Sequence, residues 1–266
     1  MIANVLLPIA ADPSCEVSLE QGLDLADRLR ARLVLVARAA EEREDFAEEL
    51  PGLERSPVER AMPKEDFWPV EGERPAAVPD VALAAAARCE ELRVAHALML
   101  AYGRLASRLR DASRLCDLAL LPRPSSPAVL TTREALRLAL SAACPCLFCA
   151  ASFLQPRRVV AWYDGSVASC RALRFTCGLV SLLNTSLTVV VSARARNRAD
   201  DLRHEARAMT AGYRIEREIT ALVGLRPTEF AALADEMGAD LVAGPPSKPI
   251  IAPALHHSSY MTLAAS

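Results

Sequence analysis

The apolar positions of the chain fall into short runs that alternate with longer amphipathic stretches. The run VLLPIA (residues 5–10) precedes a stretch, 17–29, with apolar residues every three or four positions, and a second run, LVLVA (33–37), follows. Spacing of three and four is typical of one helix face, whereas short β-branched runs indicate buried strands. This order predicts a strand, a helix and a parallel strand, the unit that builds α/β sheets.

The same pattern occurs a second time in the chain. Residues 4–39 align without a gap with residues 158–193, and the aligned identities include Leu33 with Leu187 and Val36 with Val190. In the second copy the apolar runs are VVAWY (159–163) and LTVVV (187–191). Repetition of a whole strand–helix–strand pattern predicts an internal duplication.

A further match, between DLALL (117–121) and DLVAG (240–244), has a smaller offset, so the first copy carries an insertion. Its expected place is the acidic, proline-rich segment 41–79. We therefore predict a first domain at 1–153 that contains this insert, a linker at 154–157, and a second domain at 158–266.

The pattern predicts five strands in the first domain but only four in the second. The strands expected in the first are 3–9, 33–38, 95–101, 117–121 and 146–151, with helices at 15–30, 80–91, 104–115 and 131–143. Those in the second are 158–163, 186–192, 214–222 and 240–244, with helices at 167–183, 198–211 and 227–237, before a tail. A sheet without its fifth strand would expose an edge, and this favours a homodimer that covers it.

Short motifs at the strand ends add a family resemblance. Asp164, Gly165 and Ser166 follow the first strand of the second copy, GADLVAG (238–244) leads into and spans its fourth, and Ala-Cys-Pro (143–145) precedes the last strand of the first copy. This arrangement resembles the universal stress protein family. The resemblance implies two tandem α/β domains, each an open parallel Rossmann-like sheet of strand order 3-2-1-4-5 with helices on both faces. A nucleotide would bind at the carboxyl ends of the strands.

Members of the family that bind ATP carry Gly-x2-Gly-x9-Gly-Ser/Thr after the fourth strand, where glycines let backbone amides approach phosphates. Laid on the second copy, these positions fall on Gly244, Ser247, His257 and Ser258. Two glycines are replaced, and prolines at 245, 246, 249 and 253 remove N–H donors. The resemblance implies Asp164, Val190, Gly244, Ser247 and Ser258 as candidate nucleotide-binding residues, with Lys248 and His257 as candidate phosphate partners.

The first copy departs further from this pattern. Pro122 and Ser125 stand at the first two glycine positions, and only a few residues separate them from Thr131 and Thr132. Ala10 stands where the second copy has Asp164, the position that contacts the nucleoside in family members. We expect nucleotide binding to be lost in the first copy and to be an open question in the second.

Composition and charge narrow the classes of function. The net charge of the 266-residue chain is −2, which argues against a nucleic-acid partner held by a broad basic surface. We expect no signal peptide and no membrane span, and the eight cysteines then indicate a reducing cytoplasm. Three of these cysteines, Cys144, Cys146 and Cys149, lie close together, but a zinc site would need a second ligand pair, so we expect buried thiols.

The chain has no Gly-x-Ser-x-Gly elbow, Walker loop or Gly-x-Gly-x-x-Gly fingerprint. We therefore predict a non-enzymatic cytoplasmic stress-response or signalling protein, whose two copies form an intramolecular pseudo-dimer. Two alternatives stay open. One is a switch that binds ATP in the second copy, and the other is a nucleotide-hydrolysing or nucleotidyl-transferring enzyme.

Overall fold

The computed structural model describes residues 2–39, 78–101, 105–124, 129–256 and 259–265, without the side chain of Lys248. Nearly all of the predicted insert 41–79 lies outside the described residues, as do His257 and Ser258. Within the described residues, no helix combines the length and apolar character that crossing a bilayer requires.

The first half of the chain alternates strands and helices as its apolar pattern predicts. Its elements are β1 (Asn4–Ile9), α1 (Pro13–Leu29), β2 (Arg32–Arg38), α2 (Asp80–Glu91), β3 (His96–Ala101), α3 (Leu105–Ala112), the 3-10 turn η3 (Ser113–Leu115), β4 (Leu118–Leu121), α4 (Thr132–Ser141) and β5 (Cys146–Phe148).

The second half repeats this order. Its elements are β6 (Arg158–Tyr163), α5 (Val167–Leu183), β7 (Ser186–Ala193), α6 (Arg196–Thr210), β8 (Arg217–Val223), the 3-10 turn η4 (Pro227–Glu229), α7 (Phe230–Glu236), β9 (Leu241–Gly244), α8 (Lys248–His256) and β10 (Met261–Ala264).

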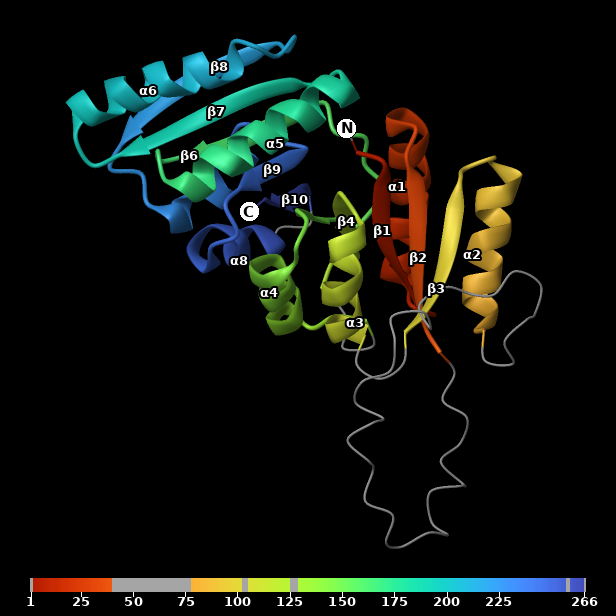
Figure 1. The fold of residues 1–266 in the computed structure, drawn as a ribbon. Coiled ribbons are helices and arrows are strands. Elements are labelled where there is room, and N and C mark those ends of the chain that lie inside the picture. Colours follow the sequence, from red (N-terminus) through yellow and green to blue (C-terminus); the bar gives the residue numbers. More distant parts are fainter. Residues whose placement is uncertain (1, 40–77, 102–104, 125–128, 257–258, 266) are drawn as a thin grey trace, which may run out of the picture.

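The described strands form one sheet in the order β3-β2-β1-β4-β5-β10-β9-β6-β7-β8 (Figure 1). Each half therefore has the strand order 3-2-1-4-5 that the family resemblance implies. Pairing is parallel within each half, whereas β5 and β10 pair antiparallel and join the halves, with Leu147 opposite Leu263. The two fifth strands thus meet at the centre of a continuous sheet.

The expectation that the second half lacks a fifth strand is wrong. Met261–Ala264 form β10, which pairs with β9 on one side and β5 on the other. The sequence MTLA is short and has little β-branched character, so its local propensity for a strand is low. Its strand conformation depends on burial between two neighbours, since Met261, Thr262, Leu263 and Ala264 are each at most 2% exposed. Because β9 is covered, the unpaired edge from which we expected a homodimer does not exist.

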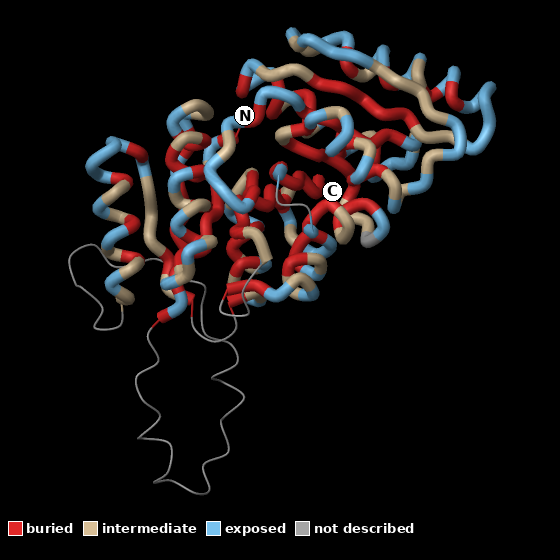
Figure 2. The backbone as a smooth tube through the Cα atoms, turned by 180° about the vertical axis from the view of Figure 1, so that it is seen from behind, coloured by how far each residue is buried: buried red, intermediate tan, exposed pale blue. Residues whose placement is uncertain are grey.

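Helices cover both faces of the sheet and separate its apolar side chains into two cores. One core lies under α1, α2, α5 and α6, and the other under α3, α4, α7 and α8. Figure 2 shows buried residues along the strands and on the inner helix faces. The alternation of side chains along each strand assigns neighbours to opposite cores, as for Leu6 and Leu7 of β1.

Two aspartates hold the first strand of each half in the same way. The Asp117 carboxylate accepts hydrogen bonds from the backbone amides of Ala3 and Asn4, at 2.8 and 2.9 Å. Asp240 accepts from the amides of Arg157 and Arg158, both at 2.9 Å. Asp117 and Asp240 therefore make equivalent contacts in the two halves. This shared role explains why both copies have Asp-Leu at the start of β4 and β9.

Contacts outside the sheet also join the halves. The buried Gln21 side chain on α1 accepts from the amide of Leu154, and Gln155 donates to Asp24 at 2.8 Å. Arg28 of α1 donates to the Leu183 carbonyl, the last residue of α5. A cation at the carboxyl end of a helix satisfies a free carbonyl and opposes the helix dipole.

Candidate functional site

The strongest candidate site begins at the tight turn after β6. The Asp164 carboxylate accepts from the amide of Ser166 at 2.9 Å, and the Ser166 hydroxyl accepts from the amide of Ser169 at 3.1 Å. Ser166 is thus the N-cap of α5. Gly165 has φ +77°, and a Cβ there would lie 2.3 Å from Leu202 Cδ2, so both the backbone and the space demand glycine.

The aligned turn of the first half does the same structural work with different residues. Asp12 caps α1 by accepting from the amide of Ser14, and the Asp12 amide donates to the Ala10 carbonyl at 2.9 Å. The cap therefore stands at the aligned position in both halves, Asp12 and Ser166. Since Ala10 occupies the position of Asp164, a carboxylate is not required there to make the turn.

Asp164 lies on the rim of a cavity of about 740 Å³ at the carboxyl ends of β6, β7 and β8. Its walls come from the ends of these strands and from the first half of α6, namely residues 162, 164–166, 192–195, 198, 202 and 224–227. Two hydrogen bonds join the end of β7 to the loop after β8: the Ser192 hydroxyl donates to the Leu225 carbonyl, and the Gly224 amide to the Ala193 carbonyl. The volume is within the range of small-molecule sites.

The charges around the cavity are mixed. Partial burial works to raise the pKa of Asp164, but hydrogen bonds from Ser166, together with Ser169 and Trp162, outweigh it and hold that pKa below its usual value. The carboxylate is therefore charged at neutral pH. Arg198 lies 3.5 Å from Glu205, and Arg226 is held by Glu229 through two hydrogen bonds. A third cavity cation, Arg194, has no ion-pair partner within the described part of the chain.

Trp162 joins the cavity to the core under α7 and α8. It lies in β6 and is 2% exposed, and its ring meets Phe230 edge to face at 5.3 Å. Its indole N–H lies near enough to Asp164 to help lower the pKa of that carboxylate.

The other predicted residues do not join Asp164 in this cavity. Val190 is fully buried in β7, opposite Trp162 in the register. Gly244 ends β9, and a Cβ there would lie 2.9 Å from Ile250 of α8. Ser247 directly precedes α8, where its carbonyl accepts from the amides of Ile250 and Ile251. Ser258 and His257 lie outside the described residues, as does the side chain of Lys248.

The chain is similar to known proteins in structure rather than in sequence. Neither a protein-family model nor a curated protein sequence matches the chain. A universal stress protein from Archaeoglobus fulgidus DSM 4304 superposes with a TM-score of 0.66 at 12% identity, covering 99% of this chain and 98% of that one. A candidate universal stress protein from Pseudomonas aeruginosa UCBPP-PA14 gives 0.64 at 14% identity, with 99% and 93% covered.

A functionally unknown protein from Pseudomonas aeruginosa PAO1 is similar to the same extent, with a TM-score of 0.63, 14% identity, and 99% and 92% covered. The chain has the universal stress protein fold. The resemblance inferred from the sequence is thereby confirmed for the architecture. At these identities the likeness establishes the fold, and ligand and role require their own argument.

The segment expected to be a phosphate loop is a helix in this universal-stress-type fold. Lys248–His256, the nine residues between Ser247 and His257, form α8. Its Ile250, Ile251, Ala254 and Leu255 are at most 4% exposed, so this face belongs to the core. Pro249 falls in the first turn, where a missing N–H is tolerated, whereas Pro253 lies inside the helix and removes one backbone donor there.

In the first half, the hydroxyl aligned with the motif has a structural role. Thr131 caps α4: its hydroxyl accepts from the Glu134 amide at 3.2 Å, and its own amide donates to the Glu134 carboxylate at 3.0 Å. This capping box satisfies the first turn of the helix. Residues 125–128, which precede it, lie outside the described part of the chain.

Sequence reasoning missed most of the cavity. Trp162, Arg194, Arg198 and Arg226 were not candidates, because the family pattern directs attention to the loop after the fourth strand. A signal was available: Arg194 and Gly224 each lie two residues beyond a predicted strand, 186–192 or 214–222, and parallel strand ends meet at one edge of the sheet.

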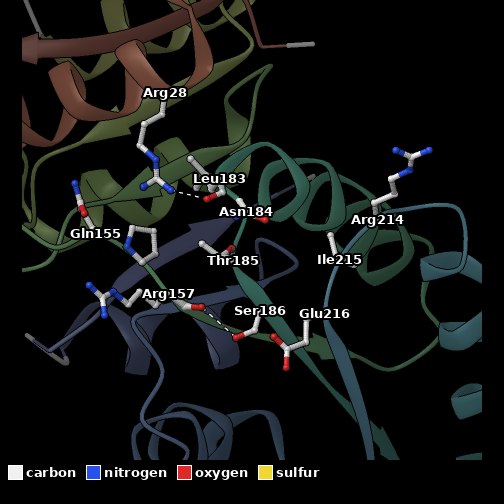
Figure 3. A pocket seen from close by; sticks show the side chains of 11 residues that line it. Arg28, Gln155, Arg157, Leu183, Asn184, Thr185, Ser186, Arg214, Ile215 and Glu216 are labelled. Atoms are coloured by element: carbon white, nitrogen blue, oxygen red, sulfur yellow. Dashed lines mark hydrogen bonds between the residues drawn. The ribbon is translucent and has the colours of Figure 1, made fainter.

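A second cavity, of about 590 Å³, lies at the opposite ends of the strands, beside the junction of the halves (Figure 3). Arg28 reaches it from α1 and donates to the Leu183 carbonyl, while Arg157 and Arg214 point toward opposite sides of the view. Its cations do not converge on one point, and Arg28 serves as the cap of α5 described above.

The clustered cysteines are buried, as expected. Cys144, Cys146 and Cys149 are at most 5% exposed, and burial raises the pKa of Cys144 to about 12 and of the other two further. These thiols stay protonated at neutral pH, which disfavours thiolate chemistry. Among the described residues, no group of three or more His, Cys, Asp or Glu side chains has metal-binding geometry.

Proposed function

We propose that the chain is a non-enzymatic cytoplasmic stress-response or signalling protein of universal-stress type, in which only the second half binds an adenine nucleotide. The observation that carries this proposal is Asp164, a charged carboxylate on the rim of a cavity of about 740 Å³. The first half makes the same turn with Ala10 in that place. The Asp164 carboxylate therefore gives the second half a charged acceptor that the first half lacks at this position.

The position of the cavity supports a small-molecule ligand. It lies at the carboxyl ends of parallel strands, where open α/β sheets bind ligands, and in the family the aligned aspartate contacts the nucleoside. The Asp164 carboxylate accepts hydrogen bonds from hydroxyl or amino groups. An adenine nucleoside offers both. The Ser166 hydroxyl beside Asp164 serves as the cap of α5, and the proposed role is binding without turnover.

The join between the halves supports a fused pseudo-dimer, with domains at 1–153 and 158–266. β5 and β10 occupy equivalent places in the two halves and pair antiparallel, as two copies related by a two-fold axis would pair. In this proposal the duplication supplies an internal partner, and it leaves one half to hold the structure while the other holds ligand.

The test is thermal unfolding of the purified full chain with adenosine, AMP and ATP. A ligand that binds only the folded state raises the melting temperature with concentration. We expect at least one of these compounds to do so, and we expect Asp164→Ala to abolish the shift while leaving the unliganded melting temperature nearly unchanged. The matched variant Ala10→Asp should neither add a second site nor alter the shift.

Two results would remove the proposal. One is the absence of a shift with all three compounds at millimolar concentration. The other is a shift that Asp164→Ala leaves intact. Release of phosphate or pyrophosphate from bound ATP would overturn the non-enzymatic part alone.

A further inference from the structure

A further cavity, of about 720 Å³, lies at the edge of the sheet in the second half. Its walls are the second half of α6 and the start of β8, namely residues 203, 204, 207, 208, 211 and 217–219. β8 is the last strand of the sheet, and α6 lies along it (Figure 1). Because this cavity is at the amino end of β8, it is separate from the cavity of Asp164 at the carboxyl ends of the strands.

Three arginines line this edge cavity, and none of them forms an ion pair with any described residue. Arg203 and Arg207 are four positions apart on α6, so they lie on one face of the helix, and Arg217 begins β8. Arg207, in the last turn of α6, also opposes the helix dipole. Arg203 and Arg217 are outside that turn, so the dipole does not explain their presence.

Among the described lining residues, Glu218 carries the single carboxylate, and the alternation along β8 directs it to the other face of the sheet. Ile219 packs against the core under α5 and α6, whereas Leu222 packs against the opposite core. Arg217 therefore shares the face of Ile219, and Glu218 that of Leu222. Burial raises the pKa of Cys177, in α5, to about 11, and the charge of Arg217 opposes this rise, which agrees with that placement.

Several hydrogen-bond donors at this cavity have no acceptor in the described part of the chain. The Nε of Arg203 is buried and has no hydrogen-bond partner there. The Leu187 amide of β7 donates to the Glu216 carbonyl, and in a parallel pair alternate residues face the neighbouring strand. The backbone amides of Arg217 and Ile219 therefore face the open edge of the sheet. A buried donor without an acceptor is costly, so an acceptor bound here would be stabilising.

We infer that the edge cavity binds a small oxyanion with two or more negative charges, held by Arg203, Arg207 and Arg217. Phosphate and carboxylate groups share the required chemistry, because a guanidinium donates paired, charge-assisted hydrogen bonds to either. Three guanidinium groups against one carboxylate favour a multiply charged ligand, and the volume is within the range of small-molecule sites. The ligand would be a second one, bound at the opposite end of the strands from the proposed nucleotide.

Isothermal titration of the full chain at low salt with inorganic phosphate, pyrophosphate and citrate tests this site. We expect pyrophosphate or citrate to bind, and Arg203→Gln and Arg217→Gln each to raise the Kd about tenfold or more. The matched control is Arg133→Gln in α4, which removes the same charge from an exposed arginine of the first half and should leave the Kd unchanged. Binding of pyrophosphate without citrate would assign phosphate groups to the ligand, and the reverse would assign carboxylates.

Two results would overturn the oxyanion site. One is the absence of binding by all three anions at millimolar concentration. The other is an equal loss of affinity in Arg133→Gln and in the cavity variants, which would show general attraction to a positive surface. Arg203 is partly buried, so if its variant fails to fold, Arg217→Gln decides, because that side chain is exposed.

Discussion

The two halves of the chain share a scaffold and differ at the strand ends. Asp117 and Asp240 bind the backbone at the start of β1 and β6 in the same manner, and α1 and α5 both end in a residue of left-handed conformation, Arg30 and Asn184. The turns after β1 and β6 diverge: one has Ala10 and no positive φ, and the other has Asp164 and a glycine at φ +77°.

The difference between the turns after β1 and β6 indicates which positions of a duplicated fold can change. Positions that terminate helices or hold strands are equivalent in both halves, because either half would lose stability without them. The turn residue at 10 and 164 changes what the cavity can bind and adds only a small contribution to stability through the bond to the Ser166 amide. A duplicated chain therefore keeps one site while the other half retains its structural contacts alone.

The largest expected effect concerns the strands that join the halves. Leu147 and Leu263 face each other in β5 and β10 and are at most 1% exposed. Each substitution to alanine should lower the free energy of unfolding by about 2–5 kcal/mol, measured by chemical denaturation, because it leaves a cavity in the core. The double variant should deviate from additivity by about 0.5 kcal/mol or more if the residues form one contact. Leu182→Ala, at a side chain 49% exposed, is the control.

One result would contradict this pairing of β5 with β10. If Leu263→Ala lowers the free energy of unfolding no more than Leu182→Ala does, β10 does not contribute to the core in solution. The second half would then lack its fifth strand.

The next largest loss of stability is expected at Gly165, in the turn after β6, and it should exceed the loss at another glycine of positive φ. Gly165→Ala combines a positive φ with a Cβ 2.3 Å from Leu202, and should cost about 2–3 kcal/mol in denaturant unfolding. Gly224→Ala has φ +82° in open space and should cost about 1 kcal/mol. Gly178→Ala, within α5 and in open space, should stabilise by about 0.5–1 kcal/mol. Equal costs at Gly165 and Gly224 would show that Leu202 moves away without penalty.

A smaller loss of stability tests whether Asp117 and Asp240 are equivalent in the two halves. Asp117→Ala and Asp240→Ala each leave two backbone amides without their carboxylate acceptor, and each should cost about 1–2 kcal/mol. Since the two sites share no partner, the double variant should show the sum of the two losses. A large loss at one aspartate and none at the other would contradict the equivalence.

The smallest effect is a pH dependence at Asp164. Its folded pKa lies below its unfolded value of about 3.9, so its contribution to stability is fully present above that value. The contribution is lost as the pH falls through the folded pKa. The stability difference between the protein and Asp164→Asn should therefore shrink below about pH 4, in denaturant unfolding repeated across pH. A difference that stays constant down to pH 2 would contradict a lowered pKa.

The sequence by itself determined most of the architecture. Apolar runs and helical spacing located the strands and most helices, because strands buried on both faces and amphipathic helices have distinct periodicities. Alignment of the copies predicted the duplication, the family resemblance implied the strand order, and Asp-Leu at the start of β4 and β9 marked positions that proved equivalent. Asp164 was a candidate because the family resemblance implies a nucleoside contact at that position, which is Ala10 in the first copy.

Only the tertiary structure decided the centre of the sheet and the contents of the site. MTLA is a strand because β5 and β9 flank it, and Lys248–His256 is a helix because its apolar face completes a core. Trp162, Arg194 and Arg198 meet at one cavity although they come from different elements. Local patterns record what a segment prefers, whereas these features depend on neighbours that are distant in sequence, and no single segment contains that information.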